Sequence, residues 1–200
     1  MKTLYFFLWI LLVLLVACGK SSAEYVIEGK LPSSAYDGEW IYLAPASNLS
    51  GRIDSVRIIN SVFTFKGKIE ELRIVRMRSV LRLKFQELLV VTEPGKIYVK
   101  IDSIGVVSGT PQNDALQTWK VARERIQRSY RFVYDSLCFA SGNDSLLLLK
   151  KRDFLRLKER EINFSLLKSQ KNTALGKFMK PMLYVTLTEK QRKTLDEISQ

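Results

Sequence analysis

The fold is decided by residues 53–67, which read IDSVRIINSVFTFKG. Apolar and polar residues alternate on both sides of Asn60-Ser61, and a period of two is typical of strands with one buried face. A polar dipeptide between two such runs is the usual connection of a two-residue hairpin. The stretch therefore predicts strands at Ile53–Ile59 and Val62–Lys66 that form a β-hairpin.

Further short strands are predicted on both sides of this hairpin. Upstream, Tyr25–Leu31 alternates and Trp40–Ala44 is an apolar-aromatic run. Downstream, arginines interleave with apolar residues, which favours a strand with one wet face. The residues of that strand are Arg73, Ile74, Val75, Arg76, Met77 and Arg78.

A second hairpin is predicted around Glu93-Pro94-Gly95-Lys96, because Pro followed by Gly favours a tight turn. Its strands would be Leu88–Thr92 and Ile97–Ile101, and Gly105–Thr110 ends the β part of the chain. Short strands at this spacing favour an antiparallel β-sandwich or a partly open barrel over a βαβ arrangement. We expect this β domain to occupy residues 25–111.

Residues 112–200 are predicted to be helical. Pro111-Gln112-Asn113-Asp114 is typical of a helix start with polar capping side chains, and Ser141-Gly142-Asn143-Asp144 of a stop and restart. Between them, apolar residues recur at steps of three and four, which places them on one helix face. These residues are Leu116, Trp119, Ile126, Tyr130, Val133 and Leu137.

The second helix is predicted at Ser145–Ser169, so the two helices would form a hairpin. Its apolar stripe comprises Leu147, Leu148, Phe154, Leu155, Leu157, Ile162, Phe164 and Leu166, with Lys150, Lys151, Arg152, Lys158 and Arg160 opposite. A third helix is predicted at Asn172–Leu183, which Pro181 ends or kinks. Thr188 and Gln191 have the spacing of a capping box that opens a last short helix. The predicted fold class is α+β.

The amino terminus has the features of an export signal. Lys2 precedes Leu4–Ala17, which are fourteen apolar residues without a charge. A helix that spans a membrane permanently needs about 20 apolar residues, so this run is short for an anchor. An uncleaved membrane anchor with an incidental cysteine remains the alternative.

Leu15-Val16-Ala17-Cys18 resembles the lipobox of bacterial lipoproteins. The resemblance implies cleavage after residue 17 and acylation of Cys18, with residues 18–24 as a polar tether. Acyl chains contribute about 0.8 kcal/mol per buried CH2, and more than one chain anchors a protein stably.

The composition excludes several kinds of chemistry. The chain contains no histidine, so the common general base and the Ser-His and Cys-His nucleophile pairs are absent. Its only cysteines are Cys18 and Cys138, which cannot supply a CxxC redox pair. We expect no cofactor and no metal. The net charge is +12, which favours anionic partners, although export argues against nucleic acid.

The β region is similar to a domain of unknown function found in lipoproteins of the Bacteroidetes, commonly placed ahead of a thioredoxin-like domain. The residues that carry the resemblance are Tyr25–Gly29, Ile41–Leu43, Ile53–Val56, Asn60, Phe63–Gly67, Glu93–Lys96, Val107–Thr110, Asn113 and Asp114. Ser61 departs from the glycine usual after that asparagine. The resemblance implies a CxxC redox domain after the connector helices, and these 200 residues contain none, so its thiol chemistry is not carried over.

Several polar residues have both a functional and a structural interpretation. Cys138 is expected to be a small buried hydrophobe near a helix end rather than a reactive thiol. Asp54 and Ser55 are expected to make turn and strand-edge hydrogen bonds. The carboxylate pairs Glu70-Glu71 and Glu159-Glu161 are expected to be solvated rather than to act as an acid/base pair across a cleft.

The aromatic and basic residues have two interpretations each. Trp40, Trp119 and Tyr130 are expected in the core rather than on a ligand platform. The basic helix faces are expected to be solvated, with orientation on an anionic leaflet as the functional alternative. Asn48-Leu49-Ser50 matches a glycosylation sequon, which carries no weight in a bacterium.

Together these features predict a non-enzymatic binding or scaffolding lipoprotein. It would be anchored in the outer membrane by lipid on Cys18 and face the periplasm, with envelope proteins or a thioredoxin-like protein as partners. The alternative is the anchoring part of a thioredoxin-like oxidoreductase whose redox domain is encoded separately.

Overall fold

The computed structural model of the protein describes residues 24–47, 51–77 and 85–198. The strands are β1 (Tyr25–Lys30), β2 (Trp40–Pro45), β3 (Asp54–Arg57), β4 (Val62–Gly67), β5 (Leu72–Met77), β6 (Leu88–Val91), β7 (Gly95–Lys100) and β8 (Val106–Ser108). The helices are α3 (Pro111–Leu137), α4 (Gly142–Ser169), α5 (Ala174–Leu183) and α6 (Glu189–Ile198), with short 3-10 turns at Ser34–Tyr36 and Tyr184–Thr186.

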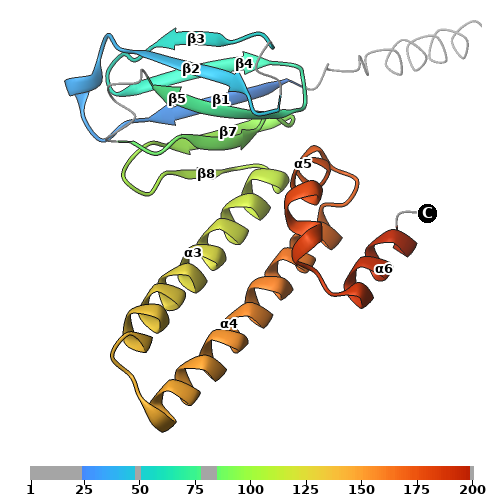
Figure 1. The fold of residues 1–200 in the computed structure, drawn as a ribbon. Coiled ribbons are helices and arrows are strands. Elements are labelled where there is room, and N and C mark those ends of the chain that lie inside the picture. The colour runs from blue at the N-terminus through green and yellow to red at the C-terminus, as the bar shows by residue number, and fades with distance from the viewer. Residues whose placement is uncertain (1–23, 48–50, 78–84, 199–200) are drawn as a thin grey trace, which may run out of the picture.

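The strands form two four-stranded sheets that lie face to face (Figure 1). One sheet has the order β4-β1-β7-β8 and the other β3-β2-β5-β6. The predicted α+β class is confirmed, and of the two β architectures expected, the sandwich is correct. One pair departs from the antiparallel expectation, because β1 and β7 run parallel.

The alternation of the strands produces the core between the sheets. Tyr25 and Ile27 point inward from β1, while Ile41 and Leu43 point inward from β2. Ile27, Ile41 and Leu43 are completely buried. The period of two in the sequence therefore identified the inward face correctly.

The turn predicted at Asn60-Ser61 is confirmed, but the hairpin around it is wrong. Asn60 and Ser61 have φ angles of 54° and 62°, and Ile59 and Val62 exchange two backbone hydrogen bonds of 3.0 and 3.1 Å. Beyond that bridge β3 pairs with β2 and β4 pairs with β1, in opposite sheets. The Asp37 carboxylate accepts hydrogen bonds from the backbone N–H groups of Asn60 and Ser61, and it fixes the turn as a corner between the sheets.

The second predicted hairpin is also wrong. β6 lies beside β5 in one sheet, whereas β7 lies between β1 and β8 in the other. Gly95, with a φ angle of 123°, directs the chain across the sandwich, and its N–H donates to the Glu24 carbonyl 3.0 Å away. A Pro-Gly sequence fixes a turn but not which strand the chain joins afterwards.

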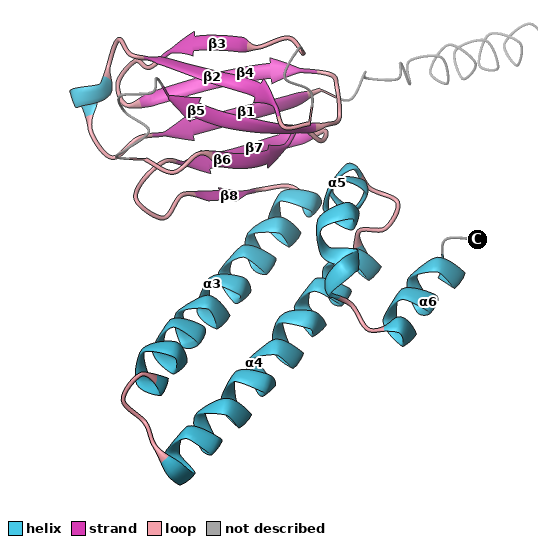
Figure 2. Cartoon of the chain, viewed as in Figure 1, coloured by secondary structure: helices cyan, strands magenta, loops and turns pink. Residues whose placement is uncertain are grey.

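Helices α3 and α4 form an antiparallel pair that projects from the sandwich (Figure 2). We call residues 111–169 the arm. The arm is held together in its outer part by Ile126, Val133 and Leu155, with Tyr130, Leu137, Leu148 and Ile162 around them. At its base, Leu116, Leu166 and Leu167 join a second core with α5, α6 and the outer face of β5 and β6. The predicted helical hairpin is confirmed.

The remaining helix boundaries follow from capping. Thr188 and Gln191 form the predicted capping box, since each backbone N–H donates to the other side chain at 3.0 and 3.2 Å. Helix α4 begins at Gly142, three residues before the predicted start. Helix α5 continues to Leu183, so Pro181 lies inside its last turn.

The loop after β7 is organised by Asp102 and joins the arm. The Asp102 carboxylate accepts from Gly105 N at 2.8 Å and Ile104 N at 2.9 Å, and Lys100 lies 3.0 Å away. The hydrogen bond from Gly105, followed by those from Lys100 and Ile104, lowers the pKa of Asp102 to about 2. Lys120 of α3 donates to the carbonyls of Ile104 and Gly105, and burial lowers the pKa of its amine.

Asp102→Asn is expected to lower the free energy of unfolding by about 1 kcal/mol at neutral pH, a modest value because the carboxyl group is partly solvated. Since the pKa is lower in the folded state, this stabilisation is fully present above about pH 4 and is lost as the pH falls through about 2. Urea unfolding at several pH values measures it. The exposed Asp135→Asn serves as the control, and a difference between Asp102→Asn and the parent that persists undiminished at pH 2 would contradict this assignment.

Candidate functional site

Three of the predicted features lie outside the described residues. Cys18, the predicted lipid attachment site, belongs to residues 1–23, and Asn48-Leu49-Ser50 falls in the gap at 48–50. Arg78 lies in the other gap, at 78–84. Within the described ranges, no helix combines the length and the apolar character needed to cross a bilayer.

Arg73 is buried, although the sequence analysis placed it on a wet face. It follows β5 inward with Val75 and Met77, and 5% of the residue is exposed. Its guanidinium lies 2.7 Å from Glu71 Oε1 and 3.0 Å from Asp54 Oδ2. It also donates to the Leu43 carbonyl at 3.3 Å. A buried guanidinium needs such compensation, and the two acids supply it.

The candidate residue Asp54 is part of this ion cluster, and Ser55 is not. Asp54 bridges Arg73 and the exposed Arg52, each at 3.0 Å, while Ser55 points to the outside of β3. Tyr25 is buried beside the cluster, and burial raises the pKa of its hydroxyl. Asp54 therefore makes ion pairs, whereas the sequence predicted turn and strand-edge hydrogen bonds.

The base of the arm contains a buried polar joint that the sequence analysis missed. Glu93 Oε1 accepts from the backbone N–H groups of Gln112 at 2.6 Å and Asn113 at 3.2 Å, so it caps the start of α3. The Gln112 amide donates to Glu93 and to Glu70, and its carbonyl accepts from Leu175 N at 3.0 Å. The joint thus ties β6, α3 and α5 together. The polar residues Gln112 and Asn113 after Pro111 were the feature of the sequence that could have indicated this joint.

Asn113 is the most deeply buried member of this joint. It is completely buried, and its side chain bonds both backbone groups of Val91, at 2.9 Å to N and 2.8 Å to O. Its amide also donates to Thr110 Oγ1 at 2.8 Å. The Asn113 side chain makes the two hydrogen bonds to Val91 that a neighbouring strand would otherwise make. It thereby fixes the position of the arm against β6.

The two members of each carboxylate pair have different partners. Glu70 accepts from Gln112 and Glu71 pairs with Arg73, so the two point to different partners. In α4, Glu159 accepts from Gln127 at 3.2 Å on one side of the arm, while Glu161 accepts from Gln191 of α6. The sequence analysis expected solvated carboxylates, and each of the four instead has a partner within the chain.

The three candidate aromatic residues are half-buried. Trp119 donates from Nε1 to Asn163 Oδ1 at 2.9 Å and thereby links α3 to α4. Tyr130 stacks on Tyr134 with ring centroids 6.4 Å apart. Arg57 lies over the ring of Trp40 at 4.5 Å. Trp119 and Tyr130 contribute to the cores of the arm, as predicted.

Cys138 is exposed rather than buried, which corrects the sequence prediction. It follows the last residue of α3 at the tip of the arm, and its thiol lies 3.5 Å from the Tyr134 carbonyl. A residue at the end of a two-helix hairpin has no third element to cover it. The parts of the chain that the structure describes hold no cluster of three or more potential metal ligands.

The outer part of the arm exposes many large apolar side chains. We call residues 125–158 the outer arm. Its exposed apolar residues are Phe132, Tyr134, Phe139, Leu146, Leu147, Phe154 and Leu157, with exposed fractions from 54% to 92%. The stripe predicted for the second helix is therefore only partly correct: Leu155 and Leu166 are buried, but Leu147, Phe154 and Leu157 face solvent. With α3 alone beside it there, α4 buries only a narrow face.

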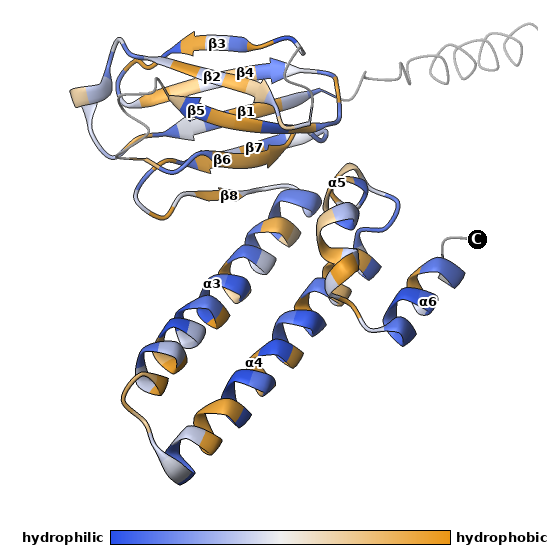
Figure 3. Ribbon diagram, in the orientation of Figure 1, coloured by the Kyte–Doolittle hydropathy of each residue, from blue (hydrophilic) through white to orange (hydrophobic). Residues whose placement is uncertain are grey.

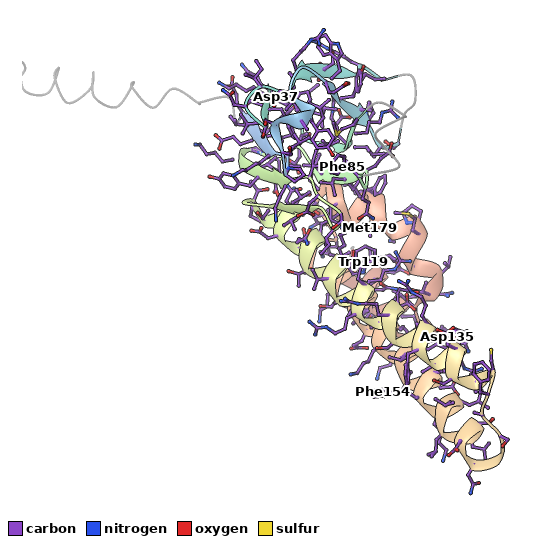
Figure 4. The ribbon with its side chains drawn as sticks, turned by 90° about the vertical axis from the view of Figure 1, so that its left-hand side faces the viewer. Asp37, Phe85, Trp119, Asp135, Phe154 and Met179 are labelled. Carbon is purple, nitrogen blue, oxygen red and sulfur yellow. The ribbon has the colours of Figure 1, made fainter. Side chains whose placement is uncertain are left out.

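The outer arm is also basic. It contains eight Lys and Arg against three Asp and no Glu. Figure 3 shows hydrophobic and hydrophilic residues interspersed along both helices, and Figure 4 places Phe154 and Asp135 on this half, with Trp119 nearer the sandwich. The outer arm therefore combines exposed apolar side chains with cations.

A groove runs between α3 and α4 on one side of the arm. Its inner part is lined by Ala115, Thr118, Trp119, Ala122, Ile162, Ser165, Leu166 and Ser169. Its outer part is lined by Ala122, Arg125, Ile126, Ser129, Leu155, Lys158, Glu161 and Ile162, with a volume of ≈ 380 Å³. The arm can therefore present an apolar surface bordered by cations to a partner.

Comparison with known proteins identifies the β domain. Residues 25–116 match the family described as "Domain of unknown function (DUF4369)", which covers the sandwich and the first residues of α3. No curated protein and no solved structure matches the chain. The match extends slightly past the predicted boundary at residue 111, and it includes the polar joint at Gln112 and Asn113.

Proposed function

Starting from a chain that carries a DUF4369 domain at residues 25–116, we propose that this protein is a lipid-anchored, non-enzymatic binding or scaffolding module of the cell envelope. Lipid on Cys18 holds it to the outer membrane, facing the periplasm. The sandwich is the support, and the arm is the binding element. The single observation that carries the binding role is the exposure of seven large apolar residues among eight cations in the outer arm.

The internal contacts of the sandwich support a scaffold. Arg73 and Glu93 are buried charged residues of the sandwich. Both make hydrogen bonds of 2.6 to 3.3 Å to other groups of the chain. Groups in such bonds position the fold and the arm, and they are not presented to a substrate. The apolar residues of the outer arm, by contrast, have their surface available.

The partner proposed is an envelope protein or a thioredoxin-like protein, as the family resemblance implies. If the module itself lacks redox activity, the purified chain fails to reduce a disulfide substrate on its own. Disulfide reduction by the chain without added partner would overturn the non-enzymatic assignment. Substitution of Cys138, its exposed thiol, by Ser is the control for direct thiol exchange.

The anchor is tested with Cys18→Ala. We expect the variant to remain unprocessed and to lose incorporation of labelled palmitate, because the cysteine thiol is the acylation site in the lipobox. Cys138→Ala should keep both processing and label. Acyl labelling of Cys18→Ala equal to the parent would refute the anchor.

A further inference from the structure

One flank of the outer arm combines cations and exposed apolar groups from both helices. Lys151 of α4 places its Nζ 4.9 Å from the ring centre of Phe132 of α3, so these two residues share a face. Lys158 lies 4.6 Å from the ring of Phe154, and it lines the same groove as Arg125. Leu147 precedes Lys151 by one turn. We call these six residues the hairpin flank: Arg125, Phe132, Leu147, Lys151, Phe154 and Lys158.

We propose that the hairpin flank binds a phospholipid surface that carries anionic headgroups. Its apolar members are Phe132, Leu147 and Phe154, which are 60%, 64% and 55% exposed. Phe and Leu side chains between Lys and Arg are the composition of helices that lie in a membrane interface, with rings in the headgroup region and cations on the phosphates.

Charge complementarity favours this occupant over an apolar groove binder. The hairpin flank has three cations and no acid. The nearest acid in the groove is Glu161 at its inner end, where it accepts a hydrogen bond from Gln191. Each Lys or Arg near an anionic leaflet gains attraction that falls off within a Debye length of about 10 Å. The Lys151 and Lys158 amines lie over the rings of Phe132 and Phe154. If the rings enter the headgroup region, these amines are close to the lipid phosphates.

The position of the arm relative to the start of the domain fits such contact. Gly95 bonds to Glu24, the first described residue, and Glu93 two positions earlier caps α3. Glu24 and the base of the arm therefore lie at the same end of the sandwich. With 27 residues at about 1.5 Å each, α3 extends about 40 Å from that point, so the arm can lie along the surface that holds the tether.

This inference rests on the proposed function in one respect, which is that the protein lies close to a membrane. The test is therefore made without the lipid, on residues 19–200, which include every described residue. Binding is measured by cosedimentation with vesicles of phosphatidylcholine containing about a third phosphatidylglycerol, and with vesicles of phosphatidylcholine alone. We expect about tenfold tighter binding to the anionic vesicles at low salt, and a loss of that difference near 1 M salt.

Two sets of variants assign the contact to the hairpin flank. The first variant combines three substitutions, Arg125→Gln, Lys151→Gln and Lys158→Gln. We expect its affinity for anionic vesicles to fall by about tenfold or more. Phe132→Ser with Phe154→Ser should reduce it as well, because the rings supply the apolar contact. All these side chains are exposed, and circular dichroism checks that the variants remain folded.

The matched control removes the same charge elsewhere. Lys30, Lys66 and Lys68 are exposed on the sandwich, and their replacement by Gln should leave vesicle binding within about twofold of the parent. Equal binding to neutral and anionic vesicles would overturn the inference, and so would equal losses in the control and flank variants. A concentration-dependent dimer abolished by the flank substitutions, without vesicle binding, would assign the surface to a second copy instead. None of these results depends on acylation of Cys18, so failure here and failure of the anchor are distinguishable.

Discussion

Asn113→Ala is expected to lower the free energy of unfolding by about 4 kcal/mol. The side chain is completely buried and supplies both hydrogen bonds of Val91, a residue that is also completely buried. Its loss leaves a buried N–H and a buried carbonyl unpaired, at about 1 to 3 kcal/mol each, and creates a small cavity. Thr110 loses its partner as well.

Urea unfolding followed by tryptophan fluorescence measures this change. In residues 19–200, which lack Trp9, Trp40 reports on the sandwich and Trp119 on the arm, so a Trp119→Phe background isolates the sandwich signal. Asn143→Ala, on the exposed first turn of α4, is the control and should change stability by less than about 0.5 kcal/mol. A loss below about 1 kcal/mol in Asn113→Ala would show that the joint with Val91 does not hold the arm.

Local periodicity predicted the elements well but not their partners. The alternation of Ile53–Lys66 identified β3, β4 and the turn at Asn60-Ser61 correctly, because these features depend on neighbouring residues. The assignment of β3 and β4 to opposite sheets depends instead on Asp37, which is distant in sequence and binds the turn. Strand pairing is a long-range property, and one sequence does not display it.

The exposure of the outer arm could not be read from the spacing of its apolar residues. Leu147, Phe154 and Leu157 recur at helical steps, as core residues do. Whether they are buried depends on how many helices surround α4, and in the outer arm only α3 lies beside it. The same pattern of residues would form a core in a larger bundle, and here it leaves a surface for binding.

Arg73 shows where the sequence did contain the correct answer. In strict alternation Arg73 belongs with Val75 and Met77, on the inward face, and not with Arg76. An arginine on that face needs counter-charges, and Asp54 and Glu71 are the acids that the fold brings to it. Because Arg73 and Arg76 are three residues apart, they lie on opposite faces of β5, and only one of these faces is solvated.

Arg73→Met is accordingly expected to lower the free energy of unfolding by about 3 kcal/mol. Methionine fills much of the space, but it leaves the Glu71 carboxylate without its ion-pair partner and Asp54 with only the exposed Arg52, at 3.0 Å. Those carboxylates are 30% and 35% exposed, so water relieves part of the cost and holds the loss near the lower end for a broken buried pair. Urea or thermal unfolding of the purified variant measures the difference.

The variant that separates charge from packing is the triple substitution Arg73→Met, Asp54→Asn and Glu71→Gln. Removing both carboxylate charges should restore at least about 1 kcal/mol of what Arg73→Met alone loses. Arg76→Met, the same substitution on the other face of β5, should cost less than about 1 kcal/mol. Electrostatic compensation predicts that Arg73→Met costs more stability than Arg76→Met and that the triple variant is more stable than Arg73→Met. If either difference is missing, the loss in Arg73→Met comes from packing in β5.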